Sequence, residues 1–205
     1  MLSVLRNRTY RHLFAAQAVA LTGTGLATVA LGLLAYDIAG PRAGSVLGTA
    51  LAIKMVAYVA IAPAVGAFAH RLPRRTLLIG ADLGRAAVAL SLPFVDRVWQ
   101  VYVLIFVLQA ASAAFTPAFQ AVIPDVLPEE RDYTRALSLS RLAYDLESLF
   151  SPALAAALLA VTGYDRLFLG TAAGFLGSAA LIFVLQAASA AFTPAFQAVI
   201  PDVLP

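Results

Sequence analysis

Four charged side chains of this sequence stand inside long apolar stretches, where a charge is costly and usually has a function. Lys54 lies nine residues after Ser45, which is about 13 Å along a helix. Arg141 and Asp145 are four residues apart and can share one side of a helix, whereas Glu147 points about 160° away from Asp145. Such groups, with Lys54 and Asp145 as the favoured pair, can bind a charged part of a small-molecule substrate or carry a coupling proton. The alternative is a structural ion pair.

Groups for catalysis or metal binding are scarce. The chain has no cysteine and two histidines, His12 and His70, which flank apolar stretches rather than lie within them. A Ser–His protease site therefore has no suitable base, and Asp82 and Asp145 would lie at different depths, which argues against a pair of catalytic carboxylates. The sequence predicts no enzyme activity, no catalytic residue, no metal site and no cofactor.

The composition places these charges in a membrane protein. Of the 205 residues, 61% are hydrophobic and 12% are charged, whereas a soluble domain carries about 45–50% apolar and about 25% charged residues. A transmembrane helix needs about 20 mostly apolar residues. We therefore predict an all-α membrane protein with six transmembrane helices, at residues 13–36, 45–69, 76–95, 99–123, 136–161 and 167–185. Its expected partners are the lipid bilayer and a small molecule, and not nucleic acid. Gln17, Gln109 and Gln120 are expected to form hydrogen bonds between helices.

Basic residues beside these stretches indicate the orientation, because cytoplasmic loops carry an excess of Lys and Arg. One side has eight of them, Arg6, Arg8, Arg11, Arg71, Arg74, Arg75, Arg131 and Arg135. The other side has three, Arg42, Arg97 and Arg166. The pattern predicts a multi-pass protein of the plasma (inner) membrane with both ends in the cytoplasm.

A long exact repeat stands at the end of the chain. Residues 104–128 and 181–205 are identical over 25 positions. Repeats that arose as structural units diverge, so we interpret residues 1–185 as the six-helix domain and 186–205 as a tail of artefactual origin. A short cytoplasmic or re-entrant helix is the alternative. Because proline removes a backbone donor, we expect the last helix to break near Pro194.

Several motifs resemble those of the major facilitator superfamily. Residues 66–75, GAFAHRLPRR, are similar to its cytoplasmic loop signature, which has a glycine, an Asp-Arg pair four residues on, and then two basic residues. Residues 5–14, 77–86, 115–117 and 123–128 fit the same branch, which includes macrolide and enterobactin efflux proteins. The resemblance covers residues 1 to about 180.

The resemblance implies roles for particular residues. Seven of them would form the loop signature or bracket a cytoplasmic gate: Gly66, His70, Arg71, Arg74, Arg75, Asp82 and Arg85. His70 stands where the family has an acid, so the carboxylate that ties the loop to its partner helix is missing. Asp82 and Arg85, three apart, are expected near the cytoplasmic end, where they can pair with each other or with the basic loop residues.

The resemblance also implies a function. A complete member has twelve spans in two halves, each built of two inverted three-helix repeats. The chain then resembles the first half of a truncated proton-coupled efflux antiporter for drugs or siderophore-like molecules, and a second six-helix half is an expected partner. Two alternatives stay open: a six-helix remnant that does not transport, and a half that works as a dimer.

Overall fold

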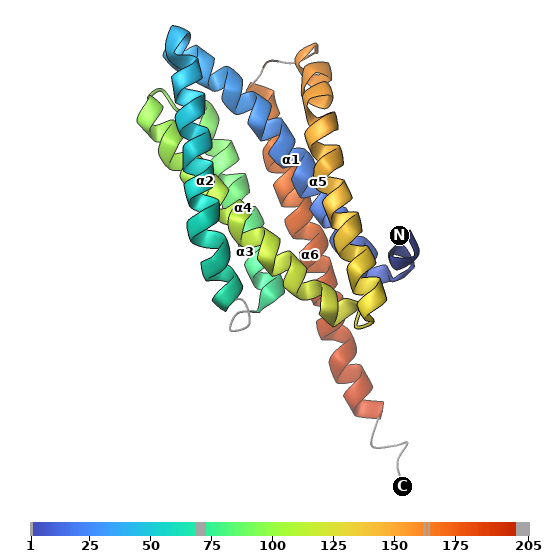
Figure 1. Cartoon of the computed structure of the whole chain (residues 1–205). Coiled ribbons are helices and arrows are strands. Elements are labelled where there is room, and N and C mark those ends of the chain that lie inside the picture. The colour runs from blue at the N-terminus through green and yellow to red at the C-terminus, as the bar shows by residue number, and fades with distance from the viewer. Residues whose placement is uncertain (1, 69–72, 162, 164, 200–205) are drawn as a thin grey trace.

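The computed structural model describes residues 2–68, 73–161, 163 and 165–199, and these residues form helices without any strand. The order of elements is a short 3-10 helix η1 (Leu2–Arg6), α1 (Arg8–Ala39), η2 (Gly40–Arg42), α2 (Ala43–Phe68), α3 (Arg74–Ser91), η4 (Leu92–Phe94), α4 (Val98–Val126), α5 (Glu130–Leu159) and α6 (Asp165–Val199). Figure 1 shows the six long helices running roughly along one direction as a bundle.

The apolar lengths agree with the predicted class. Within the described residues, five segments are long and apolar enough to cross a membrane, and the first, Arg8–Ala67, is 60 residues long and contains both α1 and α2. The all-α membrane architecture is therefore confirmed. Six separate crossings and cytoplasmic ends stay predictions and are taken up under the proposed function.

Local sequence explains where α1 begins and ends. The side chain of Asn7 accepts a hydrogen bond from the backbone N–H of Tyr10 at 3.0 Å, which caps the start of the helix. At the other end Gly40 has φ of 53°, a value that glycine adopts without a steric penalty. Pro41 then opens η2, and the chain turns back into α2.

α1 is the central helix of the bundle and contacts α2, α4, α5 and α6. Its glycines allow α5 and α6 to pack closely against it. A Cβ atom on Gly174 of α6 would lie 3.1 Å from the Cα of Gly23, and a Cβ atom on Gly25 would lie 2.3 Å from the Cβ of Ser151 on α5. Because Gly23 and Gly25 are two residues apart, they point to opposite sides of α1 and admit a helix on each side.

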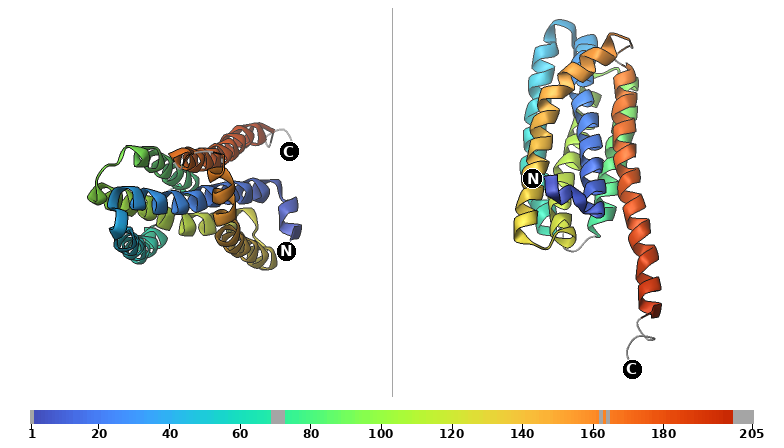
Figure 2. Two further views of the ribbon diagram at one scale, coloured as in Figure 1. Left: turned by 90° about the horizontal axis from the view of Figure 1, so that it is seen from above. Right: turned by 90° about the vertical axis from the view of Figure 1, so that its right-hand side faces the viewer.

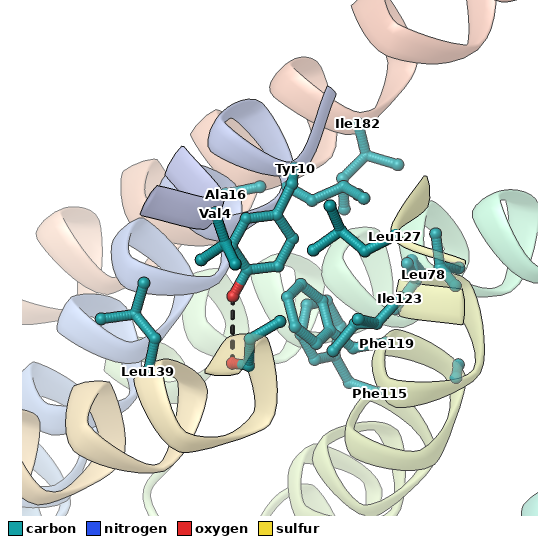
Figure 3. Close-up of a cluster of buried hydrophobic side chains, with 14 of the residues drawn as sticks. Val4, Tyr10, Ala16, Leu78, Phe115, Phe119, Ile123, Leu127, Leu139 and Ile182 are labelled. Carbon is teal, nitrogen blue, oxygen red and sulfur yellow. Dashed lines mark hydrogen bonds between the residues drawn. The ribbon is translucent and has the colours of Figure 1, made fainter. Parts of the chain in front are cut away.

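The described residues pack into two large apolar clusters. One surrounds Tyr10, which is fully buried and donates a hydrogen bond from its hydroxyl to the backbone oxygen of Ala136 at 3.0 Å (Figure 3). It draws side chains from α1, α3, α4, α5 and α6, among them Phe119 and Ile182. The other lies further along the helices and includes Phe168 of α6. Both clusters fix the α1, α3, α4 and α6 part of the bundle.

α2 and α5 are less covered than the other helices. α5 buries the smallest share of its apolar span and packs mainly against α1, whereas α2 packs against α4 and α1. Large apolar side chains of both helices are open, with Val59 76% and Leu149 69% exposed. One side of the bundle is therefore apolar and free of protein contacts within the described residues.

The predicted break near Pro194 is wrong, because α6 continues to Val199. Its 35 residues make it about 52 Å long, and Figures 1 and 2 show its last turns beyond the ends of the other helices. Prolines also lie inside α2, α4 and α5 without ending them, including Pro117 and Pro124 of the first repeat copy. In apolar helices the loss of one backbone donor at proline is commonly tolerated.

Candidate functional site

Glu147 lies on the side of α5 that faces α1. Its Oε1 accepts a hydrogen bond from the Ser151 hydroxyl at 3.2 Å, and a Cβ atom on Gly25 would come within 2.7 Å of the same oxygen. The carboxylate is half-buried. Glu147 thus combines a hydroxyl donor with partial exposure.

Lys54 lies in a small cavity between α1, α2 and α4. The cavity has a volume of about 80 Å³, and Thr28 and Gln109 are its other polar lining residues among aliphatic side chains. Lys54 is half-buried and forms no ion pair with any described residue. Its charge is therefore available to a ligand or to Glu147.

Arg141 and Asp145 lie on another face of α5. Both are exposed and line one shallow hollow together with Ser138, as their four-residue spacing predicts. They form no ion pair with each other. Asp145 and Glu147 line different hollows, which agrees with the predicted difference in direction. The pairing of Lys54 with Asp145 stays a prediction.

Asp82 and Arg85 of α3 form a buried ion pair with each other. The Arg85 guanidinium lies between two aromatic rings, 4.4 Å from the ring centroid of Phe115 on α4 and 4.5 Å from that of Phe175 on α6. The predicted pairing within this sequence motif is confirmed. The pair lies in the protein core, however. Among the described residues, Asp82 pairs with Arg85 and not with Arg74 or Arg75.

The start of α3 is bonded to the end of α4 and to Leu185 within α6. Arg74 donates hydrogen bonds to Asp125 Oδ2 at 2.6 Å and to the backbone oxygen of Ala121 at 2.8 Å. Arg75 donates to the backbone oxygen of Leu185 at 3.3 Å. Gly66 lies in an exposed turn of α2, while His70 and Arg71 fall outside the described residues.

Sequence reasoning missed a group of hydroxyl-bearing side chains in the middle of the bundle. Tyr144 and Thr116 have their hydroxyls 3.2 Å apart, and Tyr58 lines the same pocket. The predicted bond between helices is confirmed for Gln17, whose Nε2 donates to the Ser140 hydroxyl at 2.5 Å. Tyrosines inside apolar stretches were the signal from which a polar group in the bundle could have been predicted. Which tyrosines meet there depends on how each helix is rotated about its axis.

A wholly helical bundle with membrane-length apolar helices and ionisable groups in its interior defines a multi-pass membrane protein of the transporter class. The chain belongs to the Major Facilitator Superfamily, whose sequence profile matches residues 13–205. This is a family of transporters and not of enzymes.

Curated relatives support the same assignment. The uncharacterized MFS-type transporter YfiS of Bacillus subtilis is 30% identical over 175 residues, which is 84% of this chain and 41% of YfiS. Macrolide efflux protein A of Streptococcus pyogenes is 31% identical over 154 residues, 73% of this chain and 37% of that protein. The Enterococcus faecalis protein of the same name is 33% identical over 125 residues, 56% of this chain and 38% of that protein.

The chain thus spans about two fifths of the length of these relatives. No solved structure shows a significant match to it.

Proposed function

We propose that the chain forms the six-helix half of a proton-coupled exporter for drugs or siderophore-like small molecules. Its similarity to macrolide efflux proteins supports export. The observation that carries the proposal is the position of Glu147, a half-buried carboxylate that lies against α1 beside Gly25 and accepts a hydrogen bond from Ser151. A carboxylate binds a proton or a cationic group but not both at once, which is what an exchange of proton for substrate requires.

Each residue has a distinct part in this proposal. Glu147 carries the coupling proton or the cationic group of the substrate, and Lys54 balances its charge when both are absent. Arg141 and Asp145, exposed on the next face of α5, contact the substrate or the second half. The Arg74–Asp125 pair and Arg75 hold the cytoplasmic end of the gate closed.

Measurement of efflux tests the coupling role. In bacteria without their own exporters, the chain together with a second six-helix half should expel a fluorescent cationic drug, and a protonophore should stop it. Glu147→Gln should reduce efflux to the rate of cells without the protein, and Glu147→Asp should keep part of it. Asp96→Asn, in the exposed α3–α4 connection, is the matched control and should have no effect. Full efflux in Glu147→Gln would refute the role of this carboxylate.

We also propose six crossings with both ends in the cytoplasm, as two inverted three-helix repeats. The Arg8–Ala67 segment supports two crossings, because its 60 residues would be about 90 Å long as one helix and the hydrocarbon is about 30 Å thick. The chain has no cysteine, so single cysteines report without background. A membrane-impermeant maleimide should label Arg42→Cys and Arg97→Cys in intact cells, but not Ser3→Cys or Arg131→Cys. Any other pattern contradicts this topology.

The partner we propose is a second six-helix half, which covers the open apolar faces of α2 and α5. Val59 and Leu149 on these faces are the most useful positions for cross-linking. If the second half is another copy of the chain, the purified protein should have the mass of a dimer and Val59→Cys should cross-link within it. A monomer that expels nothing would instead identify a six-helix protein without transport activity.

A further inference from the structure

A small polar pocket lies in the middle of the bundle, where α1, α2, α3, α4 and α5 meet. Its volume is about 30 Å³, and its polar lining residues are Gln17, Thr24, Tyr58, Arg85, Ser112, Thr116 and Tyr144. Two of them, Gln17 and Arg85, are almost fully buried, with 1% and 3% of their surfaces exposed. This pocket is separate from the groove that contains Glu147 and from the cavity that contains Lys54.

Arg85, which lines this pocket, has one buried hydrogen-bond donor without a partner among the described residues. The rings of Phe115 and Phe175 cover the two faces of its guanidinium, so its donors are usable only in the plane of the group. One terminal nitrogen bonds Asp82, whereas Nε has no hydrogen-bond partner among the described residues. A buried charged donor without a hydrogen-bond partner lowers stability more than a neutral one does. A hydrogen-bond acceptor next to Nε would therefore be favourable.

Gln17 presents the complementary group. Its Nε2 is used in the bond to Ser140, and its Oε1 is buried without a hydrogen-bond partner in the described part of the chain. Two lining residues of the pocket therefore have an unused group, a donor in Arg85 on α3 and an acceptor in Gln17 on α1. The Arg85 guanidinium is held by its bond to Asp82, and the Gln17 amide is held by its bond to Ser140. These bonds restrict the rotation of both groups.

We propose that this pocket is a binding site for one ordered water molecule that bridges Arg85 Nε and Gln17 Oε1. Water accepts from the first and donates to the second, and the hydroxyls of Tyr58, Tyr144 or Thr116 supply its further partners. A pocket needs about 10–15 Å³ to admit a water, and buried waters make about three hydrogen bonds. A small anion satisfies Arg85 but faces the lone pairs of Gln17 Oε1. The water joins the buried ion pair of α3 to the α1–α5 bond.

Hydroxyl-radical labelling with mass spectrometry tests the proposal on the whole chain. Radiolysis of a bound water oxidises the side chains beside it even when they are buried. Phe115 lines the pocket and is 3% exposed, whereas Phe119 is 2% exposed and does not line it. Trypsin cuts after Arg97 and Arg131, which separates these rings from the identical second copy. Phe115 should be oxidised several times faster than Phe119, and equal rates would overturn the proposal.

Two variants and one ion exchange sharpen the result. Ser112→Val places a methyl group in the pocket and should lower Phe115 oxidation to the rate of Phe119, while Ser112→Ala keeps the space and the fast oxidation. If Ser112→Val does not fold, the comparison within the unmodified chain and Ser112→Ala still decides. Fast oxidation that disappears when chloride replaces gluconate would assign the pocket to an anion and overturn the water.

Discussion

The contact between Gly25 and Ser151 is the closest approach of α1 and α5, and Gly25→Ala tests what it contributes. The added Cβ atom would lie 2.3 Å from Ser151 Cβ. Carbon atoms in contact prefer about 3.5–4.0 Å, so α5 must move away by about 1.2–1.7 Å. Overpacking of this kind costs about 1–3 kcal/mol. At about 2–4 °C per kcal/mol for a chain of this size, the melting temperature should fall by several degrees.

Circular dichroism during heating in detergent measures this change, with two reference variants. Gly32→Ala, also in α1, is the matched control, because a Cβ atom there meets nothing within 4 Å. It should be neutral or stabilise by about 0.5–1 kcal/mol, the usual gain of alanine over glycine in a helix. Ser151→Gly removes the two nearest colliding atoms and leaves Glu147 Oε1, the end of a flexible side chain, so the double variant should be more stable than Gly25→Ala. A Gly25→Ala protein as stable as Gly32→Ala, or no recovery in the double variant, would refute the reasoning.

Three further predictions concern the ends of the bundle, and the same melting experiment checks the first two. Tyr10→Phe loses its bond to the Ala136 oxygen and should cost about 1 kcal/mol, whereas Tyr36→Phe, 69% exposed, should cost nothing; equal effects would contradict this. Asn7→Ala removes the cap of α1 and should also lower stability by about 1 kcal/mol. An unchanged melting curve would show that the cap does not contribute to stability. Deleting residues 186–205 should preserve the helical signal of the bundle and raise the yield in membranes. Loss of membrane insertion would instead make this segment a structural element.

The helices could be predicted from the sequence because their signal is local. Each apolar stretch is long enough to predict a helix by itself, and Gly40 followed by Pro41 marks the turn between the first two helices. The end of α6 could not be predicted in the same way. The rule that proline ends a helix comes from chains in water, and Pro117 in α4 already shows a proline inside an intact helix.

The candidate site was predictable as a set of charges but not as an arrangement. The spacing of Asp82 and Arg85 predicts their pairing, yet their burial depends on Phe115 and Phe175, which come from two other helices. Which acid of α5 lies against α1 depends on the rotation of α5, and Glu147 is the one beside Gly25. The rotation of each helix about its axis and the identity of its neighbours are tertiary properties. They cannot be predicted from any single stretch of sequence.

The ionisable groups inside the helices have a consequence for the response to membrane voltage. The charged residues within the six predicted spans are three cations and three anions, so their charges cancel when all are ionised: Lys54, Arg85, Arg141, Asp82, Asp145 and Glu147. A bundle that moves across the membrane field as one body then transfers no net charge. A proton on Glu147 changes this balance to one positive charge, on which the membrane potential acts with about 2.3 kcal/mol per 100 mV for complete transfer. The voltage sensitivity of the cycle would therefore come from what the bundle binds rather than from its own residues.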